Sequence, residues 1–436
     1  MSQLLNGQFV IKGLAIAVTT FMVGTAHAAK TEQQQIQELR QEVEALKSLI
    51  QQQQQVQQQQ QTQIAQVQQA KPAAPVSALS SLKSKSGADV SIYGSIRGDA
   101  NYIIKGADND FNSAHTSKEE ASDKLRATAK VTRLGLDFNT PVGDNKVGGK
   151  VEVDFASSDN AKSENLRIRH AYLTLNNWLF GQTTSNFLSN HAPEMIDFAT
   201  NIGGGTTRIP QVRYNYKLAP ATELFVSAEE GNSSSQIYDT KEKKNVSSDV
   251  TYRAPVLTAK VVQGFAEGKG TASARALVEH YKSEAVNDDK TGWGAALGTN
   301  YQVAEPLKVS ADVSYVKGNS NYLYGSNSAF YVNTVNGEIE QNETIGVQVG
   351  ATYKFSPQLR STLAYGALFA DDGTDYARAA NNSGANEKVQ QAWINFIYSP
   401  VKPVDLGIEY INGERETFKG QKFSDDRVGF MARYSF

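Results

Sequence analysis

The sequence of 436 residues contains no cysteine and only 11 prolines. The lack of cysteine excludes a disulfide framework, catalysis by a thiolate and zinc sites built on cysteine. Charges nearly cancel, with 43 Lys and Arg against 45 Asp and Glu, so no basic surface indicates nucleic acid as a partner. After residue 30 the chain has no run of about 20 apolar residues, which excludes a membrane protein built of helices but not a membrane β-barrel.

The first residues are typical of an export signal. Lys12 precedes the apolar run GLAIAVTTFMVG, and AHA at Ala26–Ala28 fits a cleavage site of small residues. A short buried helix is the alternative. We predict a signal peptide over residues 1–28 and export to the periplasm or outer membrane of a Gram-negative cell, which suits a protein with neither cysteine nor a membrane helix.

A glutamine-rich tract, IQQQQQVQQQQQTQ at residues 50–63, lies inside a heptad repeat. Apolar residues stay at positions a and d on both sides of the tract without a phase slip, which predicts a coiled-coil stalk over residues 29–70. Leu49 and Val56 at position g favour three strands over two, and disordered low complexity remains the alternative. KPAAP then begins a stiff linker over residues 71–88. The predicted core positions are Ile36, Leu39, Val43, Leu46, Ile50, Ile64 and Val67.

From residue 89 to the end, apolar and polar residues alternate. KVGGKVEVDF and ETIGVQVGATYKF each place apolar side chains on one face and polar side chains on the other. Such segments of about ten residues, joined alternately by tight turns and long polar loops, are typical of a transmembrane barrel. Seven tight turns between eight long loops give sixteen strands. We therefore predict an all-β fold, a 16-stranded antiparallel β-barrel over residues 89–436.

One segment decides this count. ARALVEHY at residues 274–281 could be a seventeenth strand or part of a short helix. Because a bacterial barrel has an even number of strands, we assign the segment to the fifth long loop. RAPV at residues 253–256 is then one of the seven tight turns. The others are predicted at residues 140–145, 176–177, 218–221, 303–306, 356–358 and 399–403.

Alternation also assigns the side chains that line the lumen. Ile92 and Ile96 on the lipid face turn Arg97 inward, and the other strands follow in the same way. Inward basic residues outnumber acidic ones, and guanidinium groups in a narrow aqueous lumen attract anions and pair with carboxylates. For any single arginine, the alternative to a role in solute binding is a structural role in the wall, paired with a nearby carboxylate. The predicted basic residues of the solute pathway are Arg97, Arg133, Arg167, Arg169, Arg213, Lys217, Arg253, Arg360 and Arg433, and Lys260, Lys308 and Arg427 also turn inward.

The third long loop, residues 185–208, is predicted to narrow the lumen. It carries Glu194 and Asp197, and Gly203, Gly204 and Gly205 give it freedom to fold inward. The same glycine run is a poor phosphate-binding loop, because no Lys-Ser or Lys-Thr pair follows it.

The chain ends in DRVGFMARYSF, with Tyr434 and Phe436 on one face. A terminal Phe after alternating aromatic residues resembles the signal that the outer-membrane barrel assembly machinery reads; an ordinary edge strand is the alternative. Three other features do not indicate a function. RGD at residues 97–99 lies within a strand, DDGTD at residues 371–375 lacks the later Glu of an EF-hand, and the five His lack metal-ligand spacing. We expect no enzyme activity, no metal and no cofactor.

Five stretches carry a family resemblance, namely SIYGSIRGDANY, VTRLGLDF, KVEVDF, RIRHAYLTLNNWLFGQTTSNF and RIPQVRYNYK. They resemble the DcaP-like outer-membrane porins of Acinetobacter and relatives, and the similarity covers the whole chain. The resemblance implies a homotrimer that takes up dicarboxylic acids, with phthalate-type compounds among them. It also implies contact with outer-membrane lipid and lipopolysaccharide. RLGLDF occurs across general porins, so it specifies the fold better than the substrate.

Two alternative functions stay open. A sugar porin with a periplasmic coiled coil would need a ladder of aromatic side chains in the lumen, whereas most aromatic residues here fall on the lipid face, with Tyr93 and Trp393 as candidate exceptions. The other alternative is a structural protein whose periplasmic stalk tethers the outer membrane to the cell wall. Deleting residues 30–75 separates these hypotheses, because transport should survive in a channel whereas envelope attachment should fail in a tether.

Overall fold

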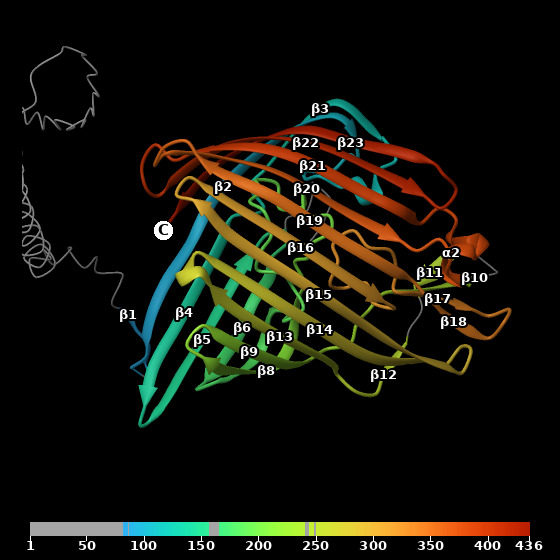
Figure 1. Ribbon diagram of the computed structural model, residues 1–436, viewed down its shortest axis with the longest axis horizontal. Coiled ribbons are helices and arrows are strands. Elements are labelled where there is room, and N and C mark those ends of the chain that lie inside the picture. Colours follow the sequence, from blue (N-terminus) through green and yellow to red (C-terminus); the bar gives the residue numbers. More distant parts are fainter. Residues whose placement is uncertain (1–81, 86, 157–164, 240–243, 248–249) are drawn as a thin grey trace, which may run out of the picture. The chain divides into compact units, whose positions relative to one another are not determined.

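The computed structural model describes residues 82–85, 87–156, 165–239, 244–247 and 250–436 (Figure 1). The predicted signal peptide, the coiled coil and most of the linker lie outside these described residues. Among the described residues, no helix is long and apolar enough to cross a membrane.

One antiparallel sheet closes on itself to form a barrel. Each strand pairs with the next along the chain, and the last strand, β23, pairs with β2, so that the described part of the chain forms sixteen barrel strands. β3 and β4 pair with successive parts of β2 and together count as one strand, interrupted at residues 129–132. The prediction of a 16-stranded antiparallel barrel is confirmed. The strands are β2 (Asp89–Gly106), β3 (Ala121–Thr128), β4 (Arg133–Val142), β5 (Asn145–Asp154), β6 (Arg167–Leu175), β7 (Trp178–Thr184), β8 (Arg208–Ala219), β9 (Thr222–Glu229), β13 (Val256–Phe265), β14 (Gly270–Ser283), β15 (Asp288–Ala304), β16 (Leu307–Lys317), β19 (Glu343–Lys354), β20 (Leu359–Ala370), β21 (Asn386–Tyr398), β22 (Val404–Thr417) and β23 (Lys422–Ser435).

The two ends of the barrel differ, and we name them by their connections. At the turn end, on the left of Figure 1, successive strands are joined by tight turns, and at the loop end most connections are longer. The loop end carries a small second sheet in the order β11-β10-β17-β18, together with short helices. The remaining elements are β1 (Leu82–Lys83), β10 (Ser235–Asp239), β11 (Lys244–Ser247), β12 (Thr251–Tyr252), β17 (Phe330–Asn333), β18 (Glu338–Gln341), η1 (Ala114–Thr116), η2 (Ala266–Gly268), α2 (Asp375–Arg378) and η3 (Ala380–Asn382).

Two local predictions were wrong, and their errors cancelled in the strand count. ARALVEHY lies in strand β14, paired along its length with β13 and β15. RAPV at residues 253–256 is no tight turn between barrel strands but the end of the connection from β9 to β13. The turn lies instead at η2, where Ala266, Glu267 and Gly268 all have positive φ. Both errors followed from assigning residues 274–281 to a long loop, whereas the connection at that position, between β14 and β15, has only residues 284–287.

Alternating side chains give the barrel an apolar outer face, as the period-2 pattern predicts. Ile96 of β2 and Leu297 of β15 are 61% and 60% exposed, whereas their neighbours Arg97 and Ala296 point to the interior and are half-buried and buried. Outward aromatic side chains include Trp178, Tyr216, Trp293, Tyr353, Phe396 and Tyr410. This face is suited to contact with lipid.

Candidate functional site

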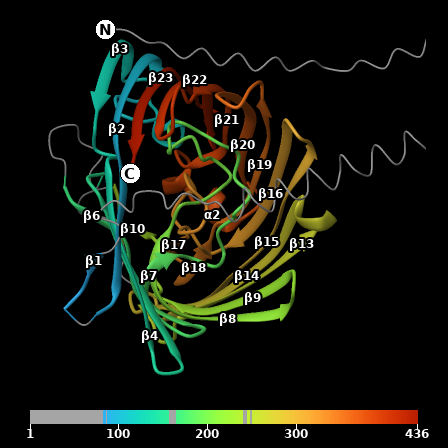
Figure 2. The ribbon, with the colours of Figure 1, turned by 90° about the vertical axis from the view of Figure 1, so that its left-hand side faces the viewer.

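A long connection folds into the barrel and narrows its interior. We call residues 185–207, between β7 and β8, loop L3, and the green trace of this loop lies inside the ring of strands when the barrel is viewed from the turn end (Figure 2). Glu409 of β22 accepts hydrogen bonds from the backbone N–H groups of Ile196 and Asp197, at 2.8 and 2.9 Å. Trp393 and Asn395 of β21 donate to the carbonyl oxygen of Glu194, at 3.0 and 3.1 Å.

The same loop is held at several other points along one wall. Arg275 of β14 donates to the carbonyl oxygen of Phe187 at 3.1 Å, and Gln348 of β19 donates to that of Ile202 at 3.1 Å. These anchors come from strands between β14 and β22. L3 therefore covers the inner face of that wall and faces the opposite wall, which is formed by β4 to β8.

The glycine run of L3 fits this close approach to the wall. A Cβ atom on Gly203 would lie 2.1 Å from the carbonyl oxygen of Val347, and one on Gly205 would lie 2.2 Å from that of Tyr322. Gly203 also has φ of +83°, which disfavours other residues. The backbone of L3 touches β19 and the connection between β16 and β19 because these positions lack side chains. Gly204, next to Gln348, belongs to the same contact.

The two predicted acids of L3 are both engaged within the protein. Glu194 makes an ion pair with Arg360 of β20, with 2.8 Å between Nη2 and Oε1. Asp197 is 2% exposed and accepts hydrogen bonds from the backbone N–H groups of Asn112 and Ala199. Burial raises the pKa of Asp197 to about 6. Neither carboxylate presents an unpaired negative charge to the interior.

Facing L3, the wall carries three arginines that share two carboxylates. Arg169 binds Glu152 and Asp154 at 2.6 and 2.9 Å, and Arg167 binds Asp154 at 2.7 Å. Arg133 lies 3.3 Å from Glu152 without a hydrogen-bonding geometry, and its Nε has no hydrogen-bond partner. We call these residues, Arg133, Arg167, Arg169, Glu152 and Asp154, the arginine cluster. It has one positive charge in excess.

A further arginine, Arg208, lies within electrostatic reach of this cluster. Its side chain is half-buried and has no ion pair or hydrogen bond with any described residue. The sequence interpretation placed residue 208 inside the third loop, whereas the structure makes it the first residue of β8. Alternation therefore gave no signal for it.

A cavity of about 240 Å³ lies where L3, the arginine cluster and the connection between β2 and β3 meet. Its charged groups are paired, because Lys130 and Arg126 both bind Asp110 at 2.8 to 2.9 Å. Aromatic rings and hydroxyl groups complete its walls. The lining includes Phe111, Lys130, Arg167, Phe198, Thr206 and Tyr324. We take this space, between L3 and the wall, as the candidate solute pathway.

The other predicted basic residues fall into two groups. Arg97, Arg427 and Arg433 bind Asp99, Asp425 and Asp405 respectively. Arg97 also donates to the carbonyl oxygen of Ile196 in L3. Lys217, Lys308 and Arg253 are exposed, and Arg253 lies in the connection between β12 and β13 rather than in a strand. Arg213 and Lys260 are described further below.

The two aromatic residues considered as exceptions to the lipid-facing pattern both point inward. The Tyr93 hydroxyl donates to Glu152 at 2.8 Å and accepts from Lys150 at 3.0 Å. Trp393 is buried against L3. These contacts assign both rings to the support of the wall and of L3.

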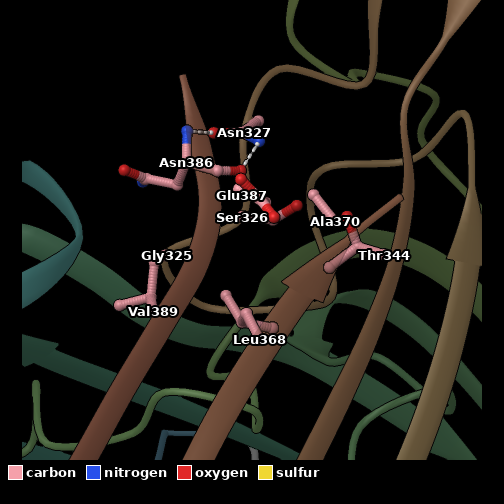
Figure 3. Close-up of a pocket in the computed structure, with 9 residues that line it drawn as sticks. All are labelled: Gly325, Ser326, Asn327, Thr344, Leu368, Ala370, Asn386, Glu387 and Val389. Atoms are coloured by element: carbon pink, nitrogen blue, oxygen red, sulfur yellow. Dashed lines mark hydrogen bonds between the residues drawn. The ribbon is translucent and has the colours of Figure 1, made fainter. Parts of the chain in front are cut away.

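A small pocket near the loop end does not offer a second pathway. It lies between β19, β20 and β21 and the segment around Ser326, and Figure 3 shows the residues that line it. Its volume of about 10 Å³ accommodates no more than a water molecule. The described residues also contain no group of three or more His, Asp or Glu side chains that could hold a metal ion.

A family model described as DcaP outer membrane protein matches residues 22–436. The chain is similar to the crystal structure of the outer membrane channel DcaP of Acinetobacter baumannii, with 66% identity and a TM-score of 0.77 over 82% of this chain and 100% of that chain. No curated protein sequence matches the chain.

Two more distant solved structures share the fold alone. One is the anion-selective porin from Comamonas acidovorans, with 13% identity and a TM-score of 0.51 over 80% of this chain and 100% of that chain. The other is OmpT of Vibrio cholerae, with 16% identity and a TM-score of 0.51 over 81% of this chain and 99% of that chain.

Proposed function

This chain belongs to the DcaP outer membrane protein family, and from that premise we propose that it is a passive channel that favours small anions, dicarboxylates in particular. The observation that carries the preference is the arginine cluster. Three guanidinium groups share two carboxylates there, while the acids of L3 opposite are bound or buried. An excess positive charge beside a narrow aqueous space raises the local concentration of anions.

Dicarboxylates fit this wall better than monovalent anions for a geometric reason. Arginine offers paired donors to carboxylate oxygens, and two such groups can each receive one end of a diacid. Arg133 and Arg208 have nitrogen atoms without a hydrogen-bond partner. We propose that these two side chains supply the donors while Arg167 and Arg169 hold the wall together.

Orientation and assembly are part of the same proposal. β2 begins at the turn end, so the preceding residues join the barrel there. We propose that the turn end faces the periplasm with the coiled coil as a stalk, and that the chain forms a homotrimer. The loop end would then face outward among lipopolysaccharide. The heptad pattern of residues 36–67 supports the stalk. We propose that the stalk also contacts the cell wall.

The experiment is the reversal potential of purified wild-type protein in a planar bilayer under a gradient of potassium chloride. We expect a preference for chloride, which Arg133→Gln should reduce by a factor of roughly 2 to 5, since one unit charge at about 4 Å in water is worth about 1 kcal/mol. Arg133 is the right member to change because Glu152 keeps Arg169 as a partner.

Two control variants separate net charge from general disturbance. Arg167→Gln combined with Asp154→Asn alters the same wall but keeps its net charge, so the preference should stay near that of the wild type. Arg378→Gln removes an exposed charge from α2 at the loop end. A wild-type channel that prefers potassium would refute the proposed anion selectivity.

A further inference from the structure

A second group of cations lines the interior on the turn side of L3. Arg213 of β8 and Lys260 of β13 flank Phe225 of β9, the strand between them. The guanidinium carbon of Arg213 lies 5.9 Å from the centroid of the Phe225 ring, and the Lys260 ammonium lies 5.1 Å from it. We call Arg213, Phe225 and Lys260 the turn-side group.

Strand register places Phe225 and Lys260 on the turn side of the contact between β9 and L3. Lys260 is directly opposite Phe225, and Arg213 is opposite Ser227. β9 runs from the turn end at Thr222 to the loop end at Glu229, and L3 contacts it at Ser227 and Glu229 through Asn186. Phe225 and Lys260 come earlier, on the turn side of that contact, whereas Arg213 is level with Ser227, so a solute that enters at the loop end reaches the group at and just beyond L3.

Neither cation of the group has an anionic partner. Among the residues that the structure describes, none makes an ion pair or hydrogen bond with the Lys260 ammonium or the Arg213 guanidinium, and the Arg213 Nε is buried without a partner. Lys260 is only 8% exposed. This differs from Arg275 nearby, whose charge is met by Asp312 at 2.6 Å.

The acid closest to the group is already engaged. Glu229 accepts hydrogen bonds from the side chains of Ser227, Thr258 and Tyr322 and from the backbone N–H of Asn186. Arg213 and Lys260 lie beside the same ring and repel each other as like charges, and the charge of Glu229 offsets only part of this repulsion. Two unpaired cations in a partly desolvated wall repel each other, and a bound anion relieves that repulsion.

We propose that the turn-side group is a second anion-binding site, separate from the arginine cluster, which takes one carboxylate group of a small organic acid. This inference rests on the proposed anion preference. The ammonium and guanidinium groups donate to the carboxylate oxygens, and the Phe225 ring beside both cations shields them from water. A diacid that leaves the arginine cluster then meets a second binding site before it reaches the turn end.

The test is the dependence of single-channel conductance on the concentration of potassium succinate, with purified full-length channels in planar bilayers. The wild type should saturate, and Arg213→Gln with Lys260→Gln should raise the half-saturating concentration by about tenfold, because two charges at contact distance are removed. Phe225→Leu, which keeps both charges, should raise it by a smaller factor.

The chain offers a closely matched control on the outer wall. Lys388 of β21 lies 5.8 Å from the ring centroid of Phe369, directly opposite it on β20, as Lys260 does with Phe225. Phe369 is exposed on the outer face. Lys388→Gln combined with Arg378→Gln therefore removes the same two charge types, including one from a cross-strand cation–ring pair, and should leave saturation unchanged.

A charge-conserving exchange guards against misfolding. Arg213→Lys with Lys260→Arg should retain saturation near the wild-type concentration, and its loss to the same degree as in the glutamine variant would overturn the site. Wild-type saturation in the glutamine variant, together with a reduced chloride preference in Arg133→Gln, would also overturn the site while leaving the proposed function intact. A cation-preferring wild type would instead remove the proposed function itself.

Discussion

Arginines with similar positions in the alternation pattern have different roles in this barrel. Arg275 and Asp312 form an ion pair with both side chains only 1% exposed, and Arg275 also holds the carbonyl oxygen of Phe187 in L3. Arg133, in contrast, is half-exposed, and the carboxylate beside it, Glu152, is also bound by Arg169. Removing the first kind of arginine leaves a buried carboxylate without a cationic partner, whereas removing the second changes the charge of the pathway.

At the residue scale we therefore expect Arg275→Gln to destabilise the barrel by about 3–5 kcal/mol, the usual cost of breaking a buried ion pair from one side. Thermal unfolding in detergent, followed by the shift in gel mobility of the unfolded chain, measures the change. The double variant with Asp312→Asn should recover most of the loss, because it leaves no unpaired charge. Equal stability of the single variant and the wild type would contradict the assignment.

At the scale of elements, the position of L3 depends on residues that could not be deduced from alternation. The sequence identifies the loop by its length and its glycines, but the anchors Glu409, Trp393 and Gln348 lie in strands some 140 to 220 residues further along. Their inward direction follows from parity, whereas their partners depend on the path that L3 takes. The glycine run predicts freedom of L3 to fold inward, and its close backbone contact with the wall adds a second reason for glycine that the sequence does not reveal.

Gly203→Ala tests the backbone contact between L3 and β19. The added Cβ would lie 2.1 Å from the carbonyl oxygen of Val347, so we expect L3 to shift from the wall and single-channel conductance to change and become noisier. Gly337→Ala is the matched control, because Gly337 has a similar φ of +79° but no atom within 4 Å of the new Cβ. If both variants change conductance equally, backbone strain and not contact explains the effect.

Strand prediction failed at the turn η2 and at strand β14, each for a physical reason. AEG at residues 266–268 has none of the Asn, Asp or Pro residues that usually mark a tight turn, although Ala266 and Glu267 both adopt positive φ there. β14 is rich in alanine, so its outer face lacks the strong apolar alternation of β19. A register shift between β5 and β6 likewise interrupts the parity beside Arg169.

At the scale of the whole molecule, sequence alternation predicts the barrel well because lipid and water act on every strand in the same way. It predicts the site less completely. Direction follows from parity, but net charge depends on which arginine meets which carboxylate, and these pairs join different strands. Arg97 and Arg213 look alike in sequence, yet only Arg97 has an acidic partner among the described residues.

The last residue, Phe436, extends the strand pairing that closes the barrel. Gly94 of β2 and Phe436 exchange two backbone hydrogen bonds, both at 3.0 Å, while the Phe436 ring lies exposed on the outer face next to Tyr434. The backbone of Phe436 therefore completes the sheet, and its ring is free for recognition. These two roles can be tested separately, because Phe436→Ala removes only the ring.

If the ring is the signal for the barrel assembly machinery, Phe436→Ala should refold from denaturant into detergent micelles as the wild type does, since both closing hydrogen bonds remain. In cells the same variant should reach the outer membrane in several-fold lower amount, as measured by the folded, heat-modifiable band in membrane fractions. Phe355→Ala is the control, because Phe355 is an outward aromatic residue at the turn end, 57% exposed, but lies away from the closing seam. A variant that fails equally in micelles and in cells would show that the ring stabilises the closed barrel itself, and a variant that fails in neither would leave the carboxy-terminal strand as an ordinary edge of the sheet.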